Sequence, residues 1–73
     1  MKLNKIKANM TEGTVGDKTV LFSYKTPVAY HQQLDKTYVT DKFWNRTTSR
    51  HINQWVAGQP VIKVSQETLD KLI

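Results

Sequence analysis

The stretch WNRTTSRHINQWVAG, residues 44–58, decides the fold because it holds the clearest helix signal in the chain. Three hydroxyl residues stand at its start, and each can cap free N–H groups: Thr47, Thr48 and Ser49. Gly58 favours a left-handed end to the helix, and Pro60 prevents the helix from resuming. The sequence therefore predicts a helix over about residues 49–57.

One side of this helix is apolar. Ile52, Trp55 and Val56 stand at positions i, i+3 and i+4, which places them in one stripe. So short a helix is only marginally stable by itself, so the stripe must pack on another element. The rest of the chain has the pattern of a sheet on which it can pack.

Strand patterns flank the helix on both sides. The segments predicted to be extended are residues 2–8, 19–24, 28–30, 37–40 and 61–64. Residues 11–19 contain two glycines and an aspartate, which predicts a turn or short hairpin. Pro27 cannot donate to a strand ladder, so we expect a bend or a sheet edge there.

The predicted fold is α+β in a single domain of residues 1–73. Short connections between consecutive strands favour a small antiparallel sheet of three to five strands. We expect the helix at about 49–57 to pack on this sheet. A short C-terminal helix is predicted at about 66–72, with Ser65 as its cap.

Composition narrows the function. Eleven lysines and arginines against six acidic residues give a net charge of +5, which attracts polyanions or simply keeps a small protein in solution. The absence of cysteine excludes disulfides and thiolate sites. No apolar run has the length of a membrane span, and the N-terminus is too polar for a signal peptide, so we expect a cytoplasmic protein without membrane contact.

Catalytic patterns do not stand out. His31 and His51 are the only histidines, whereas a zinc site needs three or four ligands. No serine lies in a G-x-S-x-G elbow. Most of the carboxylates fall in turns or at helix starts, where acids have structural roles. We therefore expect a non-enzymatic protein with no metal site and no cofactor.

The stronger functional candidate is the start of the helix, where basic residues surround Trp44. Helix N-termini bind phosphate through free N–H groups, and Arg, Asn and Gln side chains read base edges. The candidate nucleic-acid-binding residues are Lys42, Arg46, Thr47, Thr48, Ser49, Arg50, Asn53 and Gln54. The alternative is an ordinary solvated helix face with local caps.

Two segments, LFSYKTPVAY at residues 21–30 and TTSRHINQWV at residues 47–56, resemble a known family. It consists of small uncharacterised proteins encoded by bacteriophages and some microbial genomes, with the motifs LFSY-x-TPVA and TTS-x-HIN-x-W. The resemblance implies a phage-type protein with a compact α+β fold, acting in the cytoplasm of a host cell. It supplies no catalytic residue.

These observations favour a small basic nucleic-acid-binding or regulatory protein, on DNA or RNA. An alternative is a module that binds and modulates an acidic host protein, through Pro27, Tyr30 and Trp44. A minor virion component fits the same sequence. Residues 2–8 fit a short edge strand whose lysines discourage pairing with other chains. An edge strand and a small core nevertheless leave a homodimer open as an alternative.

Overall fold

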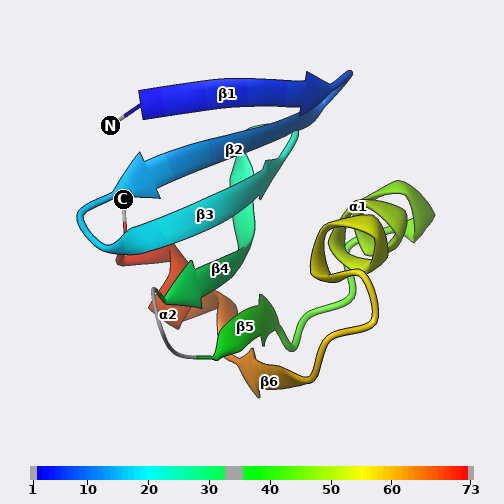
Figure 1. Ribbon diagram of the computed structural model, residues 1–73. Helices are drawn as coiled ribbons and strands as arrows, with labels where there is room; N and C mark the ends of the chain where they lie inside the picture. The colour runs from blue at the N-terminus through cyan, green and yellow to red at the C-terminus, as the bar shows by residue number, and fades with distance from the viewer. Residues whose placement is uncertain (1, 33–35, 73) are drawn as a thin grey trace.

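The computed structural model describes residues 2–32 and 36–72, which form a curved sheet with two helices (Figure 1). The strands are β1 (Lys2–Lys7), β2 (Met10–Val15), β3 (Lys18–Ser23), β4 (Thr26–Gln32), β5 (Thr37–Thr40) and β6 (Val61–Val64). The helices are α1 (Arg46–Val56) and α2 (Gln66–Asp70).

The strands follow one another across the sheet in their order along the chain. The first four pairings are antiparallel, whereas β5 and β6 are parallel. Parallel neighbours need a crossover, and α1 is that crossover. The prediction of an antiparallel sheet with three to five strands was therefore wrong: the protein is mostly sheet, with six strands in a mixed arrangement.

The face of the sheet beneath α1 carries the main apolar core. Leu21, Ala29 and Val39 lie opposite one another on β3, β4 and β5, and all three are buried. Met10 and Val56 complete this core, with Ile52 and Trp55 packed at its margin. On the other face Val20 is fully buried, and α2 packs against β4 through the fully buried Leu69.

Strand β4 contains an irregularity at Pro27, and it rules out the sheet-edge alternative of the prediction because β4 lies between β3 and β5. The register with β3 shifts between the pairs Leu21–Ala29 and Phe22–Pro27, which leaves Val28 as an extra residue. Bulges admit proline into an interior strand, because the ladder is already interrupted there. Pro27 is consequently buried rather than at an edge, and Val28 joins the core under α1.

Helix α1 starts earlier than predicted. Asn45 is the N-cap, and its Oδ1 accepts a hydrogen bond from the Thr48 backbone N–H at 2.8 Å. The three hydroxyl residues expected to cap the helix thus lie inside its first turn. At the other end Gly58 has the expected positive φ of 79°, but the left-handed turn already begins at Ala57, with a φ of 51°.

Helix α2 is shorter than the predicted 66–72 helix. Its cap is the expected residue: the Ser65 side chain accepts from the Thr68 backbone N–H at 3.3 Å. This helix follows β6 directly, so the last strand and the last helix form one short closing unit.

Candidate nucleic-acid interface

The buried side of α1 is partly polar, and this removes one predicted site residue from the surface. Thr48 and His51 are each only 4 % exposed. Hydrogen bonds join Ser23 Oγ on β3 to Thr48 Oγ1 at 2.9 Å and to His51 Nδ1 at 2.8 Å. Thr48, predicted as a nucleic-acid contact, is thus buried in this structure, and its hydroxyl is hydrogen-bonded to the sheet.

The environment of His51 favours the neutral form of its imidazole. Burial lowers the pKa of His51, and the nearby positive charge of Lys7 lowers this pKa further. A neutral imidazole suits a side chain enclosed between a helix and a sheet. We therefore assign His51 a structural role.

The outer side of α1 carries the arginines. Arg46 and Arg50 are exposed and stand one helical turn apart, so they share the face that points away from the sheet. Asn53 is exposed on the same side. Gln54, also exposed, accepts a hydrogen bond from the Lys7 ammonium at the end of β1. Lys7 thus lies beside α1, close to its basic residues. The linear sequence did not indicate this proximity.

The segment before α1 exposes two aromatic rings. Phe43 is 72 % exposed, the highest fraction among the large apolar side chains of the described residues, and Trp44 is 37 % exposed. The Lys42 ammonium lies 4.0 Å from the centroid of the Trp44 ring, a cation–π contact. Trp44 Nε1–H donates to Gln66 Oε1 at 3.2 Å, which ties this segment to the start of α2.

A groove of about 230 Å³ runs between α1 and the β5–β6 edge. Ile52, Val56 and Val61 supply apolar walls. Its polar and aromatic lining includes Asp41, Lys42, Phe43, Ser49, Asn53 and Lys63. Ser49 therefore lines the groove, and Thr47 stays exposed in the first turn of the helix.

Charge is segregated along this part of the chain. From residue 42 to residue 66 the sequence contains basic residues and no aspartate or glutamate. We name the α1 basic surface after its five exposed cations: Lys7, Lys42, Arg46, Arg50 and Lys63. Such an excess of positive charge attracts polyanions, although the exposed carboxylate of Asp41 lines the same groove as Lys42 and Lys63.

The alternative partner site is not assembled as predicted. Pro27 is buried in the bulge of β4. Tyr30 is half-buried and stacks on Tyr38, with ring centroids 4.7 Å apart. Of the three residues named for a protein partner, Trp44 alone is exposed.

Within residues 2–32 and 36–72, no three His, Cys, Asp or Glu side chains gather closely enough to hold a metal ion. Neither helix of this described region has the length and apolar character needed to cross a membrane.

Comparison with known proteins places the chain in a family without assigning it an activity. No curated protein and no solved structure matches it. The model of one family, described as a family of unknown function (DUF8033), matches residues 1–71. Since the match covers almost the whole sequence, the chain belongs to the DUF8033 family.

Proposed function

We propose that this protein binds single-stranded nucleic acid through the α1 basic surface and the rings of Phe43 and Trp44. The observation that carries the proposal is the exposure of Phe43 beside Lys42, in a segment that leads directly into the arginines of α1. Burial of a phenylalanine ring in the core would stabilise a small domain substantially. An exposed ring contributes none of this stabilisation. Its exposure is therefore best explained by a partner.

Single strands suit this surface better than a duplex. Unpaired bases stack on aromatic side chains whatever their sequence, while cations follow the phosphate backbone. Duplex DNA hides the faces of its bases, so an exposed ring beside lysine would gain little from it. The phage-type origin that the motifs imply, and a regulatory role there, stay predictions.

The test is a salt series with a fluorescently labelled 12-nucleotide single strand and the matching duplex. If the α1 basic surface neutralises about four phosphates, the affinity for the single strand falls about fiftyfold between 50 and 200 mM salt. The single strand should bind more tightly than the duplex at every salt concentration. Absence of binding to either at micromolar protein and 50 mM salt contradicts the proposal.

Charge reversal separates this surface from net charge. Arg46→Glu and Arg50→Glu should each weaken binding strongly, because both arginines face away from the sheet. Lys71→Glu is the matched control: it makes the same charge change just after α2, where Lys71 pairs with Glu67. Equal losses in all three variants would mean that only net charge matters.

Phe43→Ala tests stacking and addresses the alternative of an acidic protein partner. Its ring is exposed, so the fold should survive the change while affinity for the single strand falls. Polyglutamate of matched charge serves as the competitor. If polyglutamate displaces the nucleic acid as well as an unlabelled strand does, the surface recognises charge alone, and an acidic host protein becomes the better explanation.

A further inference from the structure

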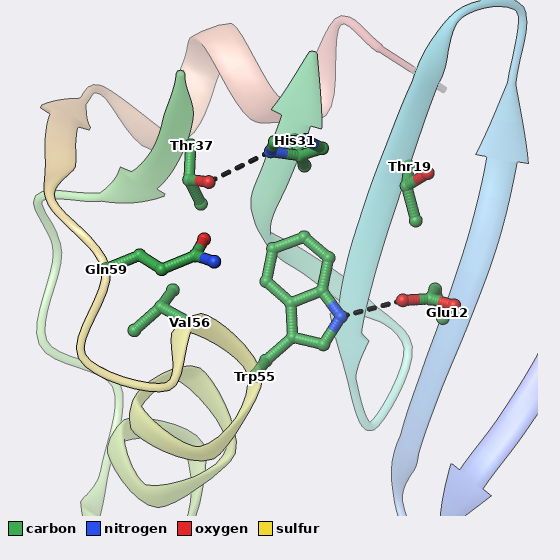
Figure 2. A pocket seen from close by; sticks show the side chains of 7 residues that line it. All are labelled: Glu12, Thr19, His31, Thr37, Trp55, Val56 and Gln59. Atoms are coloured by element: carbon green, nitrogen blue, oxygen red, sulfur yellow. Dashed lines mark hydrogen bonds between the residues drawn. The ribbon is translucent and has the colours of Figure 1, made fainter. Parts of the chain in front are cut away.

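A shallow depression of about 360 Å³ lies on the α1 side of the sheet, beside the last turn of the helix (Figure 2). Its volume lies near the lower end of the range of small-ligand sites, roughly 300–1,000 Å³. Strands β2 to β5 supply four of its polar side chains, α1 supplies the indole of Trp55, and the segment after α1 supplies Gln59. The lining residues are Glu12, Thr19, His31, Thr37, Trp55, Val56 and Gln59.

The indole of Trp55 forms a fixed platform in this depression. Its Nε1–H donates to Glu12 Oε1 at 2.8 Å, which holds the ring against the sheet. Figure 2 shows the ring face-on, with Glu12 beyond its nitrogen and Gln59 on the opposite side. Trp55 is half-buried, so part of its surface stays open. Such a platform can stack with a planar ring of similar size.

Hydrogen-bonding groups surround the platform. The Glu12 carboxylate can accept about four hydrogen bonds, and the indole uses one of these positions. His31 Nδ1 and Thr37 Oγ1 are 3.0 Å apart and fix each other at the far end of the ring. Gln59 contributes an exposed amide that both donates and accepts. A ligand must therefore be planar above the indole and must offer N–H donors toward Glu12.

Building on the proposed function, we propose that this depression binds one nucleobase, stacked on Trp55, and that Glu12 accepts a hydrogen bond from its exocyclic amino group. Carboxylates accept from the amino group of cytosine in the same way at DNA base edges. The site then favours cytosine, adenine and guanine over uracil and thymine. It gives the protein a base preference at one position of a bound strand.

The depression also adjoins the surface that would hold the backbone. Gln54, which the Lys7 ammonium contacts, directly precedes Trp55 on α1. A strand that reaches Lys7 therefore comes near the indole, whereas Arg46 and Arg50 lie on the outer side of the helix. The negative charge of Glu12 disfavours a phosphate in the depression. The phosphate backbone is therefore expected on the α1 basic surface and the base in the depression.

Free nucleosides test the site without any contribution from phosphate. In a Trp44→Phe variant, Trp55 is the sole tryptophan, so its fluorescence reports only the depression. Cytidine should quench it saturably and bind about tenfold more tightly than uridine, since a charge-assisted hydrogen bond is gained. N4,N4-dimethylcytidine keeps the ring but lacks the N–H donors, so it should bind as weakly as uridine. Ribose alone should not quench.

Replacement of the carboxylate gives the second arm. Glu12→Gln keeps an acceptor for the indole N–H, and its preference for cytidine over uridine should shrink to less than about threefold. Glu67→Gln, an equal charge change on α2, should leave the preference intact. Thermal melting of both variants shows whether the fold is retained.

Equal binding of cytidine and uridine, quenching without saturation, or binding of dimethylcytidine as tight as that of cytidine would overturn this inference. If the nucleosides fail while a labelled strand still binds with the expected salt dependence, the base site is wrong and the proposed function stands. If the strand fails while cytidine binds saturably, the α1 basic surface is wrong instead.

Discussion

Removal of one hydroxyl from β3 should destabilise the whole domain. Ser23 is 2 % exposed, and its Oγ is the shared partner of Thr48 Oγ1 and His51 Nδ1. In Ser23→Ala both groups lose this partner in a place that water cannot easily reach. The change removes little volume, so the effect isolates hydrogen bonding from packing.

The expected cost follows from the two groups that lose a bond. A buried polar group without a partner costs about 1–3 kcal/mol, so Ser23→Ala should lower the free energy of unfolding by about 2–4 kcal/mol. A domain of this length has a total stability of roughly 4–11 kcal/mol. The melting temperature should therefore fall by more than about 10 °C.

Urea denaturation followed by circular dichroism measures this loss. Thr47→Ala is the matched control, because Thr47 is an exposed hydroxyl residue one position from Thr48; it should change stability by less than about 0.5 kcal/mol. Adding Thr48→Val to Ser23→Ala should cost at least about 1 kcal/mol less than the sum of the single changes, since the two hydroxyls share one bond. Were Ser23→Ala as stable as Thr47→Ala, the reasoning about this network would be wrong.

Two further predictions concern α1. Because the pKa of His51 is lowered in the folded protein, the unfolded chain binds the proton more readily. The free energy of unfolding should therefore be highest above about pH 6.5 and should fall below it by at most about 1.4 kcal/mol per pH unit. In urea titrations between pH 5.5 and 7.5, His51→Gln should flatten this dependence. Ala57 has a left-handed φ of 51°, so Ala57→Gly should raise the free energy of unfolding by about 0.5–1 kcal/mol. Gly58 also has a positive φ, so Gly58→Ala should lower it by about 1 kcal/mol. Melting curves with the opposite order would show that the helix does not end in this conformation.

Local signals in the sequence located several elements correctly. The β-branched runs at residues 37–40 and 61–64 are β5 and β6. Ser65 caps α2, and Gly58 has a positive φ. Each of these features depends on the chemistry of a few neighbouring residues, so it can be read without knowledge of the fold.

Strand β2 could not be identified in this way. Its sequence, MTEGTV, is polar and contains a glycine, which favours a turn. In the sheet Gly13 lies opposite Val20 and is buried. Glu12 lies opposite Leu21 and faces the core side, where the Trp55 indole donates one hydrogen bond to its carboxylate. Tertiary partners make this segment a strand, and those partners lie far away in the sequence.

The site residues divide for a similar reason. Exposed residues such as Arg46 and Arg50 could be predicted because they fall opposite the apolar stripe of the helix. Thr48 and His51 precede that stripe at helical spacing, so their position hinted at burial. Their partner, Ser23, lies 25 and 28 residues away, and no local pattern reveals it.

The polar contact between α1 and β3 also explains how the helix chooses its face. Its apolar residues alone allow two settings that differ by about 100° of rotation, one residue of the helix. One setting turns Ser49, Ile52 and Val56 toward the sheet and leaves Trp55 outside. The observed one turns Thr48, His51 and Trp55 inward and still keeps Val56 in the core, with Ile52 at its margin.

Hydrogen bonds from Ser23 are available only in the observed setting, and so is the bond between Trp55 and Glu12. Burial of apolar side chains discriminates little between the two rotations of α1, so these hydrogen bonds favour one of them. A buried polar network can do so when each of its polar groups has a hydrogen-bond partner. The same rotation sends Arg46 and Arg50 outward and lays the indole over the sheet. A single buried network therefore sets the positions of both the α1 basic surface and the depression at Trp55.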